Sequence, residues 1–139
     1  MFTPVSIKGK LFRFYLLFPA HPSKIRIQNF LGRILFPGGI KISNEEGVLF
    51  VLDANDWITR ILLLQGNYET LSLVQAKKIL QNGGTFVDVG ANFGLYTCTL
   101  AQQNKATRAY AIEPNYQVLS RLINNIRQNK NVVRYFNSM

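Results

Sequence analysis

The residues of this sequence best suited to chemistry belong to an apolar segment that runs directly into a turn with two glycines. Phe86-Val87-Asp88-Val89 is followed by Gly90-Ala91-Asn92-Phe93-Gly94, where a helical pattern begins. Such a turn lets the backbone approach a ligand closely, and the first N–H groups of the helix can donate hydrogen bonds to it. Asn92 belongs to the residue types that best tolerate a positive φ without being glycine. The pattern predicts a ligand-binding turn; the alternative is a tight turn without a ligand.

A carboxylate follows the next apolar segment. Glu113 comes directly after Ala109-Tyr110-Ala111-Ile112. It lies about 20 residues beyond the turn, where a doubly wound nucleotide site places a carboxylate against ribose hydroxyls. Pro114 directs the chain away from the sheet, and Asn115 and Tyr116 begin a helix beside the expected position of an adenine. We therefore predict that Glu113 binds a ribose; the alternative is an ordinary loop acid.

Two cofactors fit a turn followed by such a carboxylate, and they differ in what the turn must accommodate. A nicotinamide cofactor normally requires the spacing G-x-G-x-x-G, because its pyrophosphate sits on the helix N-terminus. In this chain the first glycine is Gly90, but Asn92 and Leu95 occupy the other glycine positions. The pattern D-x-G-x-N-x-G from Asp88 to Gly94 instead resembles the first motif of class I methyltransferases, whose cofactor has no pyrophosphate. The comparison favours S-adenosylmethionine, with a nicotinamide-dependent oxidoreductase as the alternative.

The resemblance extends beyond the turn. The segments 86–97 and 111–115, together with the upstream Gly66-Asn67-Tyr68-Glu69, resemble the FkbM family of methyltransferases, over residues 53–136. The resemblance implies an S-adenosylmethionine-dependent enzyme. It also implies methylation of an oxygen atom on a small hydroxylated acceptor such as a sugar or a polyketide, which is an expectation drawn from the family alone.

The resemblance also implies which residues bind the cofactor. They are Glu69, Asp88, Gly90, Ala91, Asn92, Gly94, Glu113, Pro114 and Asn115. In this assignment the turn surrounds the methionine end of the cofactor, and Glu113 holds the ribose. Glu69 reaches the amino-acid end, unless it is only an acid at the start of a helix.

The acceptor side of the reaction is not identified. Methyl transfer depends mainly on holding the nucleophile, the methyl carbon and the sulfur in line. An alcohol acceptor also needs a group that takes its proton, and such groups usually follow the fourth and later strands of the sheet. The sequence ends at Met139 with the third predicted strand, so the catalytic base is unknown. We expect a truncated, cofactor-binding fragment without turnover of its own; the alternative is an inactive fragment that binds a membrane or a partner.

Strands and helices alternate throughout the region of these motifs. Strands are expected at residues 85–89, 108–112 and 132–136, and helices at residues 94–103 and 116–129. Strands separated by helices of this length imply parallel pairing with right-handed crossovers. The predicted fold class is α/β, a Rossmann-like doubly wound parallel sheet of which this chain holds a partial βαβαβ.

An N-terminal helix and a β-hairpin are predicted before this region. Residues 23–35 have the spacing of a helix with one buried apolar stripe, and residues 40–42 and 48–52 flank a loop of turn formers. The stripe comprises Ile27, Phe30, Leu31, Ile34 and Leu35. Two more helices are expected, one capped by residues 53–56 and ended by Gly66, the other over residues 70–80. We predict a basic helical arm with a hairpin subdomain over residues 1–65 and a truncated S-adenosylmethionine-binding half-domain over residues 66–139.

Positive charge is concentrated near the N-terminus. The formal net charge is +9, and seven of the 16 basic residues precede the first acid, Glu45. Apolar residues at 11–18 accompany them, which fits a helix packed on the domain, our preferred interpretation, or weak peripheral membrane contact. The run is too short for a transmembrane helix and is a poor signal peptide, so we expect a cytoplasmic location. The expected partner is a small-molecule acceptor and not nucleic acid.

Cysteine and histidine each occur once, as Cys98 and His21. A single cysteine excludes an intramolecular disulfide, and this pair cannot form a Cys/His zinc site. No metal is expected.

Overall fold

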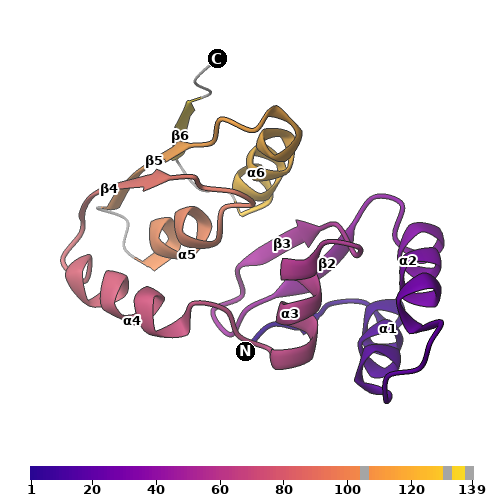
Figure 1. Cartoon of the computed structure of the whole chain (residues 1–139). Helices are drawn as coiled ribbons and strands as arrows, with labels where there is room; N and C mark the ends of the chain where they lie inside the picture. Colours follow the sequence, from indigo (N-terminus) through magenta and orange to yellow (C-terminus); the bar gives the residue numbers. More distant parts are fainter. Residues whose placement is uncertain (104–106, 130–132, 137–139) are drawn as a thin grey trace. The chain divides into compact units, whose positions relative to one another are not determined.

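The computed structural model of the chain describes residues 1–103, 107–129 and 133–136. The chain divides into two compact units, Met1–Tyr68 and Glu69–Met139 (Figure 1).

The first unit contains a three-stranded antiparallel sheet with the order β1-β2-β3. Its strands are β1 (Thr3–Pro4), β2 (Ile40–Ser43) and β3 (Leu49–Leu52), and its helices are α1 (Ile7–Leu17), α2 (Lys24–Leu35) and α3 (Trp57–Gln65). The predicted hairpin is confirmed, because β2 and β3 pair from Ile40 with Leu52 to Ser43 with Leu49. The sequence does not predict β1, since two residues that include a proline carry no strand pattern.

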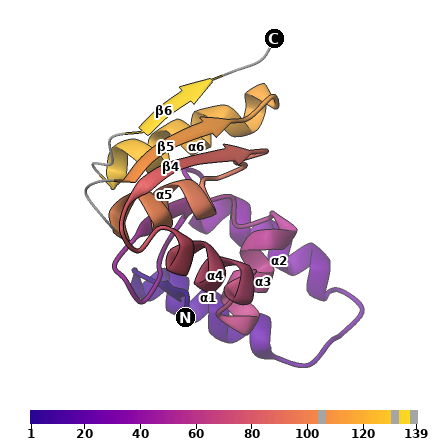
Figure 2. The ribbon, with the colours of Figure 1, turned by 90° about the vertical axis from the view of Figure 1, so that its left-hand side faces the viewer.

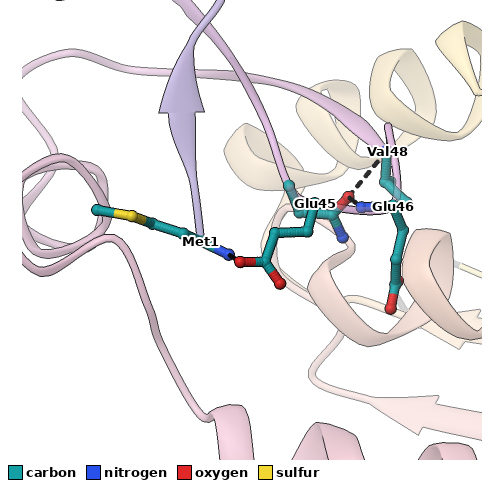
Figure 3. A network of polar contacts seen from close by, with 5 residues as sticks. Met1, Glu45, Glu46 and Val48 are labelled. Atoms are coloured by element: carbon teal, nitrogen blue, oxygen red, sulfur yellow. Dashed lines mark hydrogen bonds and ion pairs between the residues drawn. The ribbon is translucent and has the colours of Figure 1, made fainter.

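The hairpin loop is closed by Asn44. Its side-chain Oδ1 accepts hydrogen bonds from the N–H groups of Glu46, at 3.0 Å, and Val48, at 2.9 Å. Asparagine commonly starts a chain reversal in this way. The ammonium group of Met1 forms an ion pair with Glu45 of the same loop at 2.7 Å (Figure 3). Both side chains are exposed, so this ion pair contributes little to stability.

Alternate residues of the hairpin form the core of the first unit. Ile40, Ile42, Phe50 and Leu52 are at most 2% exposed, as expected for strands with one buried face. Helix α3 begins and ends where the sequence predicts. Asp56 is its N-cap and Gly66, with φ of 72°, is its left-handed C-cap.

The buried stripe predicted for α2 is wrong. Ile27, Phe30 and Ile34 are 39%, 62% and 60% exposed, whereas Gln28 and Gly32 are buried. Leu31 and Leu35 are half-buried. The reason is steric: a Cβ on Gly32 would collide with Asn55 Oδ1. The helix approaches its neighbours closely through the residue without a side chain, and the larger apolar side chains therefore point outward.

The second unit confirms the predicted α/β class. After α4 (Thr70–Ile79) come β4 (Gly84–Val89), α5 (Leu95–Gln103), β5 (Thr107–Ile112), α6 (Tyr116–Gln128) and β6 (Val133–Phe136). The three strands are parallel, in the order β4-β5-β6, and lie side by side in Figure 2. The predicted first residue of the last strand, Val132, lies outside the described residues.

The register of this sheet positions the candidate site. Val89 pairs with Ile112, and Ile112 pairs with Phe136, so the carboxyl ends of the three strands are level. The turn that follows β4 and the residues that follow β5 therefore leave the same edge of the sheet. In open α/β sheets this is the edge where ligands bind.

None of the helices in the described part of the chain combines the length and the apolar character that a membrane crossing requires.

Cys98 of α5 is fully buried in the second unit. Burial raises the pKa of its thiol to about 12, the negative charge of Asp88 acts in the same direction, and a hydrogen bond with Asn129 opposes them. The thiol therefore stays protonated near neutral pH.

We expect Cys98 to be inert in the folded protein, because the thiolate is the reactive form and the side chain is inaccessible. Native protein at pH 8 should not react with 5,5′-dithiobis(2-nitrobenzoic acid) over minutes, and urea-unfolded protein should release one equivalent of the chromophore. Rapid labelling of the native protein would contradict the burial of this residue.

Candidate functional site

The turn between β4 and α5 contains three residues in the left-handed backbone conformation. The value of φ is 79° at Gly90, 49° at Asn92 and 90° at Gly94. Glycine adopts this region freely, and asparagine and aspartate adopt it more readily than other residues do. The left-handed conformation predicted for Asn92 is confirmed. The residue types at all three positions follow from the backbone that the turn requires.

The two glycines of the turn serve different purposes. A Cβ on Gly94 would lie 2.8 Å from Leu122 Cδ1 and 3.2 Å from Cys98 Sγ, so the missing side chain lets α6 pack closely. A Cβ on Gly90 would meet no atom within 4 Å. The main chain at Gly90 therefore faces open space, through which a ligand can approach it.

Hydrogen bonds to backbone groups hold the turn in place. The carbonyl oxygen of Ile112, the last residue of β5, accepts from the N–H groups of Gly90 at 2.8 Å and Ala91 at 3.0 Å. The side-chain amide of Asn125, fully buried in α6, donates to the carbonyl oxygen of Phe93 at 2.9 Å. The turn is thus fixed from β5 and from α6. Asn125 was not predicted as a site residue. The sequence feature that could have identified it is a polar residue on the otherwise apolar face of α6.

Glu113 joins the two segments that leave the sheet. Its carboxylate is buried, with the residue 6% exposed. Its Oε2 accepts from the N–H of Asn92 at 2.8 Å, and its Oε1 accepts from the N–H of Asn115 at 2.8 Å. Charged hydrogen bonds of this kind are among the stronger ones in proteins. The residue predicted to bind ribose therefore has a structural task that the sequence does not reveal.

Asp88 anchors the first turn of α5. Its Oδ2 accepts from the N–H of Thr97 at 3.1 Å and from the Thr97 hydroxyl at 2.5 Å. Burial raises the pKa of Asp88; the two hydrogen bonds from Thr97 lower it, and the negative charges of Glu113 and Glu69 raise it further. A carboxylate at a helix N-terminus satisfies an N–H group that has no partner within the helix. Thr97 was not predicted as a site residue.

Glu69 lies beside the same turn although it is distant in sequence. It is the N-cap of α4 and has a left-handed φ of 52°. In the described part of the chain, Glu69 and Asn92 are the residues other than glycine with a positive φ. Its Oε2 accepts a hydrogen bond from the Tyr96 hydroxyl at 2.7 Å. The ring of Tyr96 stacks on Phe86 of β4, with centroids 6.5 Å apart. Tyr96, which was not predicted as a site residue, thus ties Glu69 to the sheet.

The three acids of residues 69–139 are Glu69, Asp88 and Glu113. Glu69 and Glu113 both help to raise the pKa of Asp88 by electrostatic repulsion. The three carboxylates therefore act on one region around the turn, although the chain as a whole carries a net charge of +9. Among the residues that the structure describes, no group of acids, cysteines or histidines is arranged to hold a metal ion.

The last two predicted residues lie at the start of α6. Asn115 is the N-cap of this helix, and its Oδ1 accepts from the N–H of Gln117 at 3.0 Å. Pro114 is exposed. Both follow Glu113 at the edge of the sheet that carries the turn, so the structure brings the predicted residues from both segments together. Their contacts with a cofactor stay a prediction.

Comparison with known proteins is informative at the level of structure. No family model matches the sequence, and the curated proteins gave no match either. TYW2 from M. jannaschii, solved in complex with AdoMet, is similar with 31% identity and a TM-score of 0.52, over 68% of this chain and 41% of its own.

Two Pyrococcus horikoshii structures are also similar. TYW2 in complex with MeSAdo has 18% identity and a TM-score of 0.54, over 86% of this chain and 50% of its own. A protein provisionally named a transferase, PH0793, has 17% identity and a TM-score of 0.57, over 84% of this chain and 48% of its own. The chain thus spans half or less of each of the three solved proteins. The likenesses show that it has the fold of class I S-adenosylmethionine-dependent methyltransferases.

The two glycines of the turn should respond differently to the same substitution. Gly90→Ala and Gly94→Ala both place a side chain at positive φ, which costs roughly 1–2 kcal/mol. Gly94→Ala also forces a methyl group against Leu122, and such overpacking typically costs about 1–3 kcal/mol more. We expect Gly94→Ala to lower the free energy of unfolding more than Gly90→Ala does. Urea denaturation followed by far-ultraviolet circular dichroism measures the difference, and equal losses would contradict the separate roles.

Proposed function

We propose that this chain binds S-adenosylmethionine at the turn between β4 and α5 and forms the cofactor-binding part of a methyltransferase. The observation that carries the proposal is the turn itself. The backbone at Gly90 is open to a ligand, and the turn stands at the carboxyl edge of a parallel sheet. Such an edge is where doubly wound folds bind nucleotides. The solved TYW2 complexes with AdoMet and MeSAdo support the same assignment.

The charge around the turn fits this cofactor better than a dinucleotide. S-adenosylmethionine carries a positive sulfonium and a positive ammonium group against one carboxylate. A nicotinamide dinucleotide instead brings a negative pyrophosphate to the same turn. Because Glu69, Asp88 and Glu113 all act on this region, attraction favours the cationic ligand and repulsion opposes the pyrophosphate. The residue types present therefore fit the cofactor that the fold implies.

The carboxylates take distinct parts in this proposal. A carboxylate offers about four lone-pair positions, and the two N–H groups that Glu113 accepts leave room for ribose hydroxyls. Glu69 is exposed at the start of α4 and can attract the ammonium group of the amino-acid end. Asp88 accepts both hydrogen bonds from Thr97 through Oδ2, and in this proposal it acts by shaping the turn and by its charge.

The bound cofactor would supply an electrophilic methyl group for direct displacement by an acceptor atom. The residues of this chain hold the cofactor and orient it; the group that accepts the acceptor's proton is not assigned. From the resemblance to the FkbM family, we propose that the acceptor atom is the oxygen of a small hydroxylated compound. The D-x-G-x-N-x-G turn and the segment of Glu113 to Asn115 support this narrower family assignment.

The proposal predicts a preference between two commercially available ligands. The chain should bind S-adenosylhomocysteine in preference to NADH, because three carboxylates act on the turn and Leu95 replaces the third glycine of the dinucleotide motif. Isothermal titration calorimetry of the full chain with each ligand, and in competition, measures this preference. Tighter binding of NADH under matched conditions would reject the methyltransferase assignment and favour an oxidoreductase.

A second prediction isolates the role of Glu69. Glu69→Gln keeps an oxygen that can accept from Tyr96 but removes the charge. S-adenosylhomocysteine retains the ammonium group, and hydrogen bonds to charged groups contribute about 1.5–3 kcal/mol. We expect affinity for S-adenosylhomocysteine to fall about tenfold, which corresponds to about 1.4 kcal/mol. The unfolding midpoint should stay close to that of the parent.

Tyr96→Phe and Glu46→Gln complete this experiment. Tyr96→Phe keeps the stacking on Phe86 but removes the hydrogen bond to the Glu69 carboxylate, so it should weaken binding less than Glu69→Gln does. The double variant Glu69→Gln/Tyr96→Phe should bind no more weakly than Glu69→Gln alone. Glu46→Gln removes a charge from an exposed loop of the first unit and should leave affinity unchanged. If Glu69→Gln binds as the parent does, Glu69 is only a helix-start acid.

A further inference from the structure

Helix α1 is apolar on two opposite faces. Phe12 and Leu16 are buried in the first unit, at 2% and 3% exposure. On the other side Ile7, Leu11 and Phe14 are 77%, 63% and 62% exposed. Their spacing of four and three residues places them on one face of a helix. Packing within the first unit therefore explains one apolar face of α1 but not the other.

Helix α2 has the same organisation. Its exposed residues Ile27, Phe30 and Ile34 follow one another at intervals of three and four, opposite to the buried Gln28 and Gly32. We call the two exposed faces together the outer apolar surface. It comprises Ile7, Leu11, Phe14, Ile27, Phe30 and Ile34.

The connection between the two helices is fixed by a lysine. Lys24, the first residue of α2, donates from Nζ to the carbonyl oxygens of Leu16, at 2.9 Å, and of Phe18. The Tyr15 hydroxyl and the His21 ring are 3.3 Å apart across the same connection. The helices contact each other and lie next to one another in the first unit (Figure 1).

The charges on α1 and α2 themselves are all of one sign. The first 44 residues contain no acid, and their basic residues are Lys8, Lys10, Arg13, Lys24, Arg26, Arg33 and Lys41. At 100° per residue, Lys8 and Lys10 fall on the two flanks of the exposed face of α1. Arg26 and Arg33 fall on one flank of the exposed face of α2. Long basic side chains in such positions can cover apolar surface while their charges reach outward.

We propose that the outer apolar surface binds the surface of an anionic lipid membrane. Exposed apolar side chains between basic residues are the pattern of helices that lie in a membrane interface, with the apolar face in the acyl boundary and the cations at the headgroups. The basic residues of α1 and α2, which carry no acid, match anionic headgroups. Nucleic acid would use the cations but gives no role to the apolar face, and a second copy of the chain would bring the same cations into repulsion. The contact is peripheral and is independent of the cofactor site.

The test is co-sedimentation of the full chain with vesicles of phosphatidylcholine, with and without phosphatidylglycerol. We expect binding only where phosphatidylglycerol is present. The double variant Phe14→Ser/Phe30→Ser should weaken it at least about tenfold, because burial of a phenylalanine side chain is among the larger apolar contributions. Lys8→Gln/Lys10→Gln should weaken it about fivefold for each charge removed. All four residues are exposed, so the variants should keep the circular dichroism spectrum of the parent.

A matched control is offered by α4. Leu71 and Ile79 are 84% and 79% exposed in the second unit, and Leu71→Ser/Ile79→Ser should leave vesicle binding unchanged. Equal binding to both kinds of vesicle, no binding, or an equal loss in the control would overturn the proposal. So would a dimer in analytical ultracentrifugation that Phe14→Ser/Phe30→Ser disperses, or binding to transfer RNA in place of vesicles.

Discussion

The buried carboxylate of Glu113 is the interaction on which the second unit's site depends. A carboxylate removed from water needs partners that replace its hydration, and Glu113 finds them in the main-chain N–H groups of Asn92 and Asn115. These two groups belong to segments that leave adjacent parallel strands. One side chain therefore sets the distance between the turn after β4 and the start of α6. Any ligand held between the two segments inherits its geometry from this bridge.

The remaining restraints act on the same turn from other directions. Asp88 holds the first turn of α5 through Thr97, and Asn125 of α6 holds the carbonyl of Phe93. Gly94 brings α6 close because it lacks a side chain. Left-handed backbone conformations persist only where the surrounding structure fixes them. Together with the hydrogen bond from Asn92 to Glu113, these contacts satisfy that condition, and they leave the open side at Gly90 as the direction from which a ligand can approach.

Local patterns in the sequence predict most of the elements but few of the contacts between them. The strands and helices of the second unit follow from apolar segments and their spacing, and Asp56 and Gly66 mark the ends of α3 in the way that caps normally do. The pairing of Tyr96 with Glu69 joins residues 27 positions apart, and that of Asn125 with Phe93 joins residues 32 apart. No local pattern encodes such pairs. The stripe of α2 was misassigned for a related reason, since the periodicity of an amphipathic helix identifies an apolar face but not whether something covers it.

The distribution of charge connects the stability of the site with ligand binding. Repulsion from Glu69 and Glu113 helps to raise the pKa of Asp88, so the negative charges around the turn oppose one another. Hydrogen bonds from Thr97, Tyr96 and the two main-chain N–H groups offset part of that repulsion. A cationic ligand would remove more of it, and a ligand that binds only the folded chain stabilises that chain by mass action. In the proposed complex, the acids that attract a cationic ligand therefore also make the folded second unit more stable when that ligand is bound. An anionic ligand at the same place would increase the repulsion, so the charges favour one class of cofactor both by attraction and by their effect on stability.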